Sequence, residues 1–335
     1  MIAPDLADDF RGKSVLVTGG LGFIGSTLAH ELVEQGSRVA LIDSLIPEYG
    51  GSRANVEGIE DRVEIHVSDV RDEHSLREHV RGRDVIFNLA GQTSHLDSMV
   101  DPYTDLDINA RAQLSILEAC RHNNPDAKLV FASTRQLYGR PRYLPVDEEH
   151  PVAPVDVNGI NKAAGEWYHL VYGDVYGIPV SVLRLTNTYG PRMRVRDARQ
   201  TFLGDWLRRL VTGEELVIWG DGEQRRDFNY VDDAVRAFLL VAARDDANGQ
   251  IYNLGDSDHV SLKELAELLV RLHGGSYRLE PFPSDRKAID IGDYYSDYAR
   301  IRDALGWEPR IGLEEGLGRT LAFYRERGPG TYWAE

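Results

Sequence analysis

Glycines at positions 19, 22 and 25 have the spacing G-x-x-G-x-x-G where a predicted strand passes into a predicted helix. Without a Cβ, glycine lets the chain turn tightly and lets a pyrophosphate approach the backbone. The helix beginning here also offers free N–H groups and its positive dipole end to a phosphate. A tight strand-to-helix turn without a ligand would use the same glycines. The residues predicted to contact a bound dinucleotide here are Gly19, Gly22, Phe23, Ile24 and Gly25.

A carboxylate ends the next predicted strand. Asp43 lies 18 residues after Gly25, where a carboxylate binds the ribose hydroxyls of a dinucleotide. Its charge would repel a 2′-phosphate, so the pattern favours NAD over NADP. Asp69 has a structural alternative as the N-cap of the helix that follows it. Further contacts with NAD are predicted after the next two strands, from Asp69, Val70, Leu89 and Ala90.

The elements that must position these residues alternate between short β-branched runs and amphipathic stretches, which is typical of βαβ units on a buried parallel sheet. The predicted strands are residues 13–19, 37–43, 62–69, 84–91, 128–134 and 179–187, and the clearest helices are 26–36, 113–123 and 161–177. We expect an α/β fold with a Rossmann-type doubly wound parallel sheet and a smaller mixed α/β substrate lobe. The NAD-binding domain is expected over 1–186, with returns from about 228–256, and the substrate lobe mainly over 187–335.

Composition narrows the class of protein. The 335 residues carry a net charge of −16, which disfavours nucleic acid and anionic membranes as partners. No apolar run approaches the roughly 20 residues of a membrane span, and the first thirteen residues lack the apolar segment of a signal peptide. The single cysteine, Cys120, is expected to be buried and fits a reducing cytoplasm. We therefore expect a cytoplasmic protein with a small-molecule partner.

Several motifs occur in order along the chain: the glycine run, Asn109 in Asp-Leu-Asp-Ile-Asn, Ser133-Thr134, Asn187 before Thr-Tyr-Gly-Pro-Arg-Met, Arg226-Asp227 and Leu305-Gly306-Trp307. Together they resemble the extended short-chain dehydrogenase/reductase superfamily, and within it the nucleotide-sugar epimerases, dehydratases and decarboxylases. The segment Gly-Pro-Arg-Met and the following Asp-Ala-Arg are similar to UDP-glucuronate decarboxylases. Ser94-His95 is similar to sugar 4,6-dehydratases. The resemblance implies a bound NAD and a nucleotide-sugar substrate.

The resemblance also implies a catalytic tyrosine four residues before a lysine, because residues with this spacing share a helix face. Lys162 keeps the lysine position, where it is expected to hold the nicotinamide ribose, but Asn158 occupies the tyrosine position. An amide can orient a hydroxyl but cannot take its proton. Asn158 has a structural alternative as a helix cap. Thr134 is expected to bind the sugar O4, so the predicted catalytic residues are Thr134, Asn158 and Lys162.

Four other groups could replace the missing base: His95, Tyr138, Tyr143, and Lys162 itself if burial lowers its pKa. The sequence does not rank them. His95 could instead pack at a helix end, Tyr138 could be a buried aromatic, and Tyr143 could be an ordinary loop residue.

A second departure from the resemblance lies at Arg135 and Gln136. Dehydratases carry an Asp-Glu pair here that acts at the 6-hydroxyl edge of the sugar, and decarboxylases carry a glutamate at the second position. Neither carboxylate is present. The dehydratase interpretation is therefore the poorer match, and the decarboxylase interpretation is weakened but stays open.

Arginines and one amide are predicted to bind the substrate. The resemblance implies that Asn187 and Arg226 contact the nucleotide diphosphate and that Arg286 supplies a second guanidinium. A guanidinium is suited to bidentate phosphate binding. Arg199 belongs to a basic loop, residues 192–199, that is either an anion-binding loop or a solvated charged loop. The predicted substrate-binding residues are His95, Asn187, Arg199, Arg226 and Arg286.

The most concrete function that these residues predict is an NAD-dependent nucleotide-sugar 4-epimerase, which acts on a UDP-sugar through a transient 4-keto intermediate with an atypical base. The alternatives are a UDP-uronate decarboxylase or another keto-sugar-forming enzyme, and a catalytically silent NAD and nucleotide-sugar-binding protein. No metal site is predicted from the ten histidines. The resemblance implies a homodimer paired through segments 109–121 and 159–176.

Overall fold

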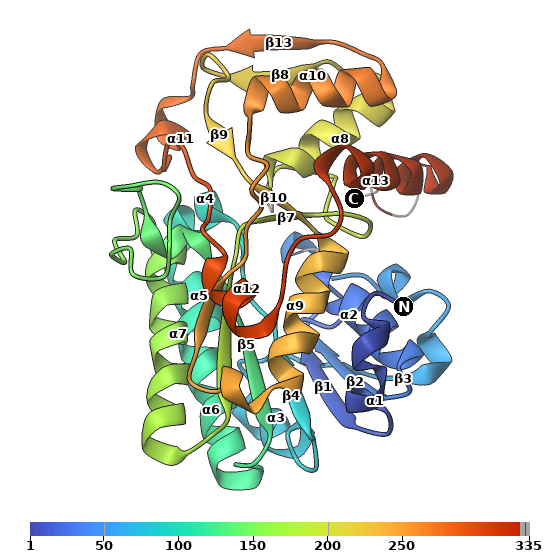
Figure 1. The fold of residues 1–335 in the computed structure, drawn as a ribbon, viewed down its shortest axis with the longest axis vertical. Helices are drawn as coiled ribbons and strands as arrows, with labels where there is room; N and C mark the ends of the chain where they lie inside the picture. Colours follow the sequence, from blue (N-terminus) through green and yellow to red (C-terminus); the bar gives the residue numbers. More distant parts are fainter. Residues whose placement is uncertain (50, 200, 329–331, 333–335) are drawn as a thin grey trace.

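A seven-stranded sheet forms the centre of the protein (Figure 1). The computed structural model describes residues 1–49, 51–199, 201–328 and Tyr332. All seven strands are parallel and lie in the order β11-β6-β5-β4-β1-β2-β3. Their bounds are β1 Ser14–Thr18, β2 Arg38–Asp43, β3 Val63–Val67, β4 Val85–Asn88, β5 Lys128–Thr134, β6 Val180–Leu185 and β11 Ile251–Asn253. The predicted Rossmann-type doubly wound fold is confirmed.

Helices cover both faces of this sheet because successive side chains of a strand point to opposite sides. Val15 and Val17 of β1 belong to one core with apolar residues of α2 (Phe23–Glu34) and α9 (Val231–Ala243). Leu16 belongs to a second core with residues of α3 (Glu73–His79) and α6 (Ala112–Asn123), which includes the buried Cys120. Both faces are therefore covered, and the ligand-binding edge is left at the carboxyl ends of the strands.

The longest helix, α7 (Val157–Tyr176), packs beside α6 and carries both residues of the Asn158–Lys162 spacing. It begins at Asp156, whose Oδ1 accepts a hydrogen bond of 2.7 Å from the Gly159 N–H. The alternative role of Asn158 as a helix cap is therefore wrong, because Asp156 is the cap. Two short helices, α4 (His95–Val100) and α5 (Pro102–Leu106), pack against α7, followed by a π-helical segment, η5 (Asp107–Arg111).

The residues after β6 form a smaller set of elements at the other end of the molecule (Figure 1). Three strand pairs occur there: β7 (Asn187–Tyr189) with β10 (Phe228–Tyr230), β8 (Leu216–Trp219) with β13 (Tyr277–Glu280), and β9 (Arg225–Arg226) with β12 (Val260–Ser261). The helices there are α8 (Phe202–Thr212), α10 (Leu262–His273), α11 (Ser284–Ala288) and α13 (Leu313–Arg327), whereas α12 (Ala299–Leu305) packs against β11 of the central sheet. Between β10 and β12 the chain returns to the sheet, where α9 packs against it and β11 pairs with β6.

Short segments complete the chain. The first helix is α1 (Ala7–Phe10). Single 3-10 turns are η1 (Pro4–Leu6), η2 (Pro47–Tyr49), η3 (Arg53–Val56), η4 (Glu60–Arg62), η6 (Arg135–Tyr138) and η7 (Asp245–Ala247). Within the described ranges, no helix combines the length and the apolar character that crossing a bilayer requires.

Candidate active site

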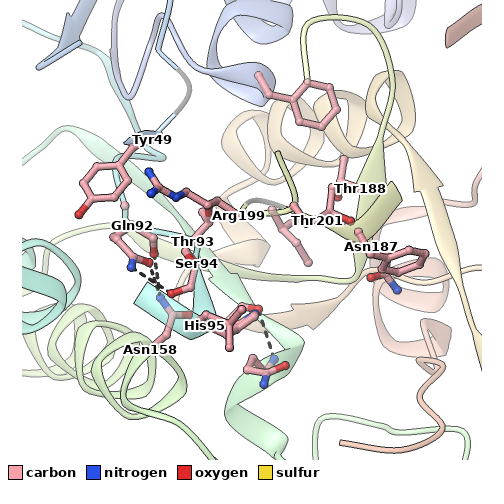
Figure 2. A pocket seen from close by; sticks show the side chains of 18 of the residues that line it. Tyr49, Gln92, Thr93, Ser94, His95, Asn158, Asn187, Thr188, Arg199 and Thr201 are labelled. Carbon is pink, nitrogen blue, oxygen red and sulfur yellow. Dashed lines mark hydrogen bonds between the residues drawn. The ribbon is translucent and has the colours of Figure 1, made fainter. Parts of the chain in front are cut away.

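One cavity of about 820 Å³ collects almost all of the predicted site residues. It extends from the carboxyl ends of β1, β2 and β4 to the smaller set of elements, and Figure 2 shows part of its lining. Gly22 does not line it, but caps α2 from the turn. The predicted residues that line the cavity are Gly19, Phe23, Ile24, Gly25, Asp43, Asp69, Val70, Leu89, Ala90, His95, Thr134, Asn158, Lys162, Asn187, Arg199, Arg226 and Arg286.

The glycine turn packs too closely for side chains. Gly19 has a φ of +67°, and a Cβ there would lie 3.0 Å from the Ala90 nitrogen. A Cβ on Gly25 would collide with the Gly19 carbonyl oxygen. The turn therefore brings bare backbone and the first turn of α2 to the cavity wall, a cradle that fits the pyrophosphate of a dinucleotide.

Asp43 borders the same part of the cavity. Its Oδ2 accepts a hydrogen bond from the Leu21 N–H at 3.0 Å, and its Oδ1 accepts one from the Leu45 N–H at 2.9 Å. Burial raises the pKa of Asp43, although these two hydrogen bonds oppose the effect. The carboxylate is thus anchored to the glycine turn while it faces the space where a ribose would lie.

Asp69 also lines the cavity, but it does not cap a helix. The cap of α3 is Asp72, whose Oδ1 accepts from the backbone nitrogens of His74 and Ser75. Asp69 instead forms an ion pair with Arg71, with 2.6 Å between Oδ2 and Nη2. The structural alternative for Asp69 is therefore wrong.

Lys162 lies deep in the cavity wall. Its Nζ donates to the Ala132 carbonyl oxygen at 3.2 Å. A Cβ on Gly91 would come within 2.8 Å of this Nζ and 3.0 Å of the Asn109 Oδ1, a buried oxygen that has no hydrogen-bond partner among the described residues. Burial lowers the pKa of Lys162 to about 8, and Asp105 partly offsets this. The Lys162 ammonium therefore lies beside a space that stays open because Gly91 has no side chain.

Asn158 is buried, and acceptors surround its amide nitrogen (Figure 2). Nδ2 donates to the Gln92 carbonyl oxygen at 2.8 Å and to Asp105 Oδ2 at 3.0 Å. Two oxygen acceptors on one side fix the orientation of the amide, because only the NH₂ group can donate to them. The Oδ1 atom therefore remains as the acceptor that Asn158 can offer to a hydroxyl in the cavity.

Asp105 organises a buried cluster of amides that the sequence analysis missed. Its Oδ2 accepts from Asn109 at 3.0 Å as well as from Asn158, and its Oδ1 accepts from Asn161 at 2.8 Å. A fully buried carboxylate is tolerated because these donors replace its lost water. The sequence signal for this contact is that Asp105 lies four residues before Asn109, a spacing that places two side chains on the same face of a helix.

His95 is the first residue of α4 and lies against the start of α7. Its Nδ1 is 3.1 Å from Oδ2 of Asp156, whose side chain is fully buried, whereas the His95 side chain is 37% exposed and lines the cavity. Gln136 also donates to this Oδ2, at 2.8 Å. Burial would raise the pKa of Asp156, but the nearby His95 and the hydrogen bonds from Gly159 and Gln136 outweigh it and lower the pKa. The His95 imidazole therefore lies beside a buried, ionised carboxylate.

The two tyrosines considered as replacement bases lie outside the cavity lining. Tyr138 is fully buried, and its hydroxyl donates to Asn253 Oδ1 at 2.7 Å and accepts from Arg184. Burial raises the pKa of Tyr138 to about 12. Tyr143 is an exposed loop residue whose hydroxyl donates to Asp147, and this hydrogen bond raises its pKa to about 12. Neither phenol is placed to take a proton from a ligand in the cavity.

At the far end of the cavity lie the predicted phosphate-binding residues. Arg226 is buried, with its Nη2 3.6 Å from Asp290 Oδ1, and burial together with nearby Arg135 lowers its pKa to about 10. Asn187 donates to the Asp227 carbonyl oxygen at 2.9 Å. The Arg286 guanidinium lies over the Trp219 ring, 4.3 Å from the centroid, and both residues border the cavity.

Of the arginines in the described part of the basic loop, Arg199 alone lines the cavity, where its Nε lies 3.5 Å from Asp97 Oδ2. Arg194 contacts Asp197 at 2.7 Å and the Pro47 carbonyl oxygen at 2.7 Å, which ties the loop to the segment after β2. Tyr49 from that segment reaches the cavity and was missed by the sequence analysis (Figure 2). In the described part of the chain, no group of His, Cys, Asp and Glu has the arrangement of a metal site.

The doubly wound sheet, the glycine turn and Asp43 define a dinucleotide-binding protein of the Rossmann type, and the cavity continues from the dinucleotide cradle into a second compartment lined by arginines. Residues 15–255 match the model of the NAD dependent epimerase/dehydratase family. The chain belongs to this family. It is an enzyme of the family, and NAD is its cofactor.

Individual relatives span nearly the whole chain. It is 31% identical over 325 residues to the UDP-N-acetyl-alpha-D-glucosaminuronate decarboxylase of Bacillus cytotoxicus, which covers 94% of this chain and 98% of the relative. The structure of the Thermotoga maritima UDP-glucose 4-epimerase with UDP-glucose is 31% identical, with a TM-score of 0.85 over 94% of this chain and 99% of that one. The Thermus thermophilus UDP-glucose 4-epimerase complex with NAD is also 31% identical, with a TM-score of 0.83 over 92% and 98%.

Proposed function

We propose that the protein is an NAD-dependent 4-epimerase of nucleotide sugars, with a UDP-sugar as substrate. The observation that carries this proposal is one continuous cavity, whose lining runs from Asp43 past Lys162 to Arg226 and Arg286. It offers a place for NAD at one end and for a nucleotide diphosphate at the other, with Thr134 and Asn158 between them. We retain the division into a cofactor domain over 1–186, with returns from about 228–256, and a substrate lobe over 187–335.

Bound NAD supplies a reversible acceptor for the hydride of a sugar C4–H bond, so that a 4-keto sugar forms and is reduced on its other face. Lys162 holds the nicotinamide ribose. Thr134 Oγ1 accepts a hydrogen bond of 3.2 Å from the Gln136 N–H, which leaves its own hydrogen free to donate to the sugar O4. Asn158 Oδ1 accepts from a sugar hydroxyl and so orients the ring.

His95 takes the role of the missing tyrosine. Its Nδ1 lies 3.1 Å from the Asp156 carboxylate, and Nε2, on the other side of the ring, accepts the 4-hydroxyl proton as hydride leaves C4. When hydride returns, the same Nε2–H gives the proton back to O4. Hydrogen bonds from Gly159 and Gln136 fix this carboxylate, which favours a proton on Nδ1 and leaves the Nε2 lone pair to act as the base.

Turnover tests the proposal. The NAD-bound protein is incubated with UDP-glucose and UDP-glucuronate, and with the C4 epimer of each, while nucleotide-sugar products are separated and NADH absorbance is followed. Interconversion of a C4 pair supports the 4-epimerase. Loss of CO₂ from the uronate would instead support the decarboxylase, to which the Bacillus relative is similar in sequence. Binding without any turnover would support the silent binding protein.

We also propose a homodimer that pairs through α6 and α7. An apolar row on α7 is exposed at helical spacing: Ile160 is 54% exposed, Trp167 56%, Val171 49% and Val175 61%. Such a contiguous exposed patch is typical of an interaction surface.

We further propose a cytoplasmic location. The chain has one cysteine, Cys120, and its thiol is free and buried, which supports this location.

A further inference from the structure

Arg135 is a cavity-lining cation that the proposed mechanism does not use. Within the described residues, its guanidinium makes one hydrogen bond, from Nη2 to Asn187 Oδ1 at 2.8 Å. Nη1 is buried without an acceptor. The Tyr294 ring packs on the guanidinium, with 4.9 Å between the ring centroid and the Arg135 Cζ. The Arg135 guanidinium is therefore held in place, while most of its N–H groups make no hydrogen bond to the described residues.

The carboxylates near Arg135 are already engaged by other groups. Asp227 accepts from the Thr186 hydroxyl through Oδ1 and from the Ser296 N–H through Oδ2 at 2.9 Å. Asp290 lies beside Arg226 and accepts from Gln224 at 2.8 Å. Leaving a donor of a charged group without an acceptor is costly in the protein interior. An acidic ligand in the cavity would supply the acceptor that the protein does not.

The position of Arg135 indicates which part of the ligand it meets. It directly follows Thr134, and its hydrogen bond to Asn187 links it to the end of the cavity where Arg226 lies. On the proposed function, Thr134 binds O4 and Arg226 binds the diphosphate on C1. Arg135 then lies along the edge of the sugar ring between these two contacts. A planar guanidinium pairs best with a planar carboxylate, which forms two parallel hydrogen bonds with it.

We propose that Arg135 binds the carboxylate of a nucleotide-linked uronic acid, so that the substrate of this enzyme is a nucleotide uronate rather than a neutral nucleotide sugar. This inference rests on the proposed function for the placement of the sugar. The carboxylate stays ionised in the ion pair, which suits epimerisation at C4 with retention of the acid group. The same guanidinium could meet an anion from another source, the diphosphate, and the experiment separates the two.

Calorimetry with NAD-bound protein compares three ligands: UDP, UDP-glucose and UDP-glucuronate. The wild type is expected to bind UDP-glucuronate about tenfold or more tightly than UDP-glucose. Arg135→Gln is expected to remove this preference and leave the affinity for UDP unchanged. Arg135→Lys, which keeps the charge but not the planar fork, is expected to retain part of it. Arg142→Gln, at an exposed arginine outside the cavity lining, is the matched control and should keep the full preference.

Two outcomes would overturn the inference about Arg135 and leave the proposed function standing. Equal wild-type affinities for UDP-glucose and UDP-glucuronate would show that no carboxylate is recognised, and this measurement needs no variant. An equal loss of affinity for all three ligands in Arg135→Gln would assign Arg135 to the diphosphate. If the wild type binds none of the three, the proposed function fails along with the inference. A variant that keeps its UDP affinity is folded, so a loss of preference in it reports on the carboxylate.

Discussion

Asn158 Nδ2 lies 3.0 Å from Asp105 Oδ2, and the two side chains are buried together between α5 and α7. The residue at the position expected for a catalytic tyrosine is therefore one donor in an amide cluster around a carboxylate. Asn109 and Asn161 complete that cluster. The asparagine has a structural partner of its own, so a phenol could not replace it without leaving Asp105 short of a donor.

We predict that Asn158→Asp is destabilised in a pH-dependent way. Two carboxylates about 3 Å apart cannot both stay ionised without strong repulsion, so the pair binds a proton more tightly when folded than when unfolded. The added destabilisation is present at neutral pH and falls as the pH is lowered and the pair takes up that proton. Melting temperatures at pH 7.5 and pH 5 would measure it. The exposed Gln250→Glu is the control, and an equal loss at both pH values would contradict the prediction.

Asn158→Tyr is expected to lower stability by about 1–3 kcal/mol, because Asp105 and the Gln92 carbonyl lose their shared donor. We expect turnover to fall as well, since the ring would displace the amide that orients the sugar. Urea unfolding and steady-state turnover would check both effects. A strong rise in turnover would instead show that the asparagine is a simple loss of the family's base.

Removing His95 or its partner should slow turnover without abolishing binding. His95→Ala is expected to lower kcat by about 10²–10⁴ with little change in KM, and free imidazole should restore part of the rate. Asp156→Asn keeps an oxygen to cap α7, but it removes the charge beside Nδ1 and places an NH₂ group against the donating Gln136 amide, so both kcat and the melting temperature should fall. The exposed His74→Gln is the control. If His95→Ala keeps the kcat of the wild type, His95 is not the base, and Lys162 is the next candidate.

Lys162 should make stability rise with pH. Burial lowers its pKa to about 8 when folded, compared with 10.5 when unfolded, so between these values the unfolded chain binds a proton that the folded chain does not. Stability therefore rises from pH 8 toward pH 10.5, by a total of about 3 kcal/mol. Urea unfolding at pH 7.5 and pH 9.5 should show a smaller rise for Lys162→Met than for the wild type. Lys13→Met, at an exposed site, should match the wild type.

Asp43 should set the preference for NAD. Asp43→Ser is expected to weaken NAD binding about tenfold, because a charge-assisted acceptor for the ribose hydroxyls is lost. NADP should bind the variant no worse than the wild type, since the repulsion of its 2′-phosphate is removed. Titration of both dinucleotides would give the two affinities, with the exposed Asp61→Asn as control. An equal loss for both cofactors would mean that Asp43 only supports the turn, through Leu21.

Trp167→Glu should separate the proposed dimer. The substitution places a charge in the centre of the exposed apolar row on α7, and burying an unpaired charge at an interface is costly. Light scattering after gel filtration would report a dimer for the wild type and a monomer for the variant. Val67→Glu, at an exposed apolar residue of β3, should leave the mass unchanged. A monomeric wild type would refute the proposal.

The sequence was sufficient for the sheet and for the cofactor end of the cavity. Six strands lie within their predicted segments, and the glycine run and Asp43 meet at one edge. This succeeded because parallel strands bring all their carboxyl ends to the same side, so residues that follow successive strands become neighbours. The two structural alternatives, a helix cap at Asp69 and one at Asn158, were wrong because Asp72 and Asp156, three and two residues away, cap these helices instead.

Local patterns in the chain determined the class of fold, the turn at Gly19 and the absence of a tyrosine at position 158. Only the tertiary structure decided what surrounds that position. Asp105 meets Asn158 across 53 residues, and Asp156 meets His95 across a similar span, because α4 and α5 pack against α7. Such contacts depend on how helices pack, and periodicity records only which face of a helix is apolar. The partners of a buried polar group are therefore set by the folded arrangement of distant segments.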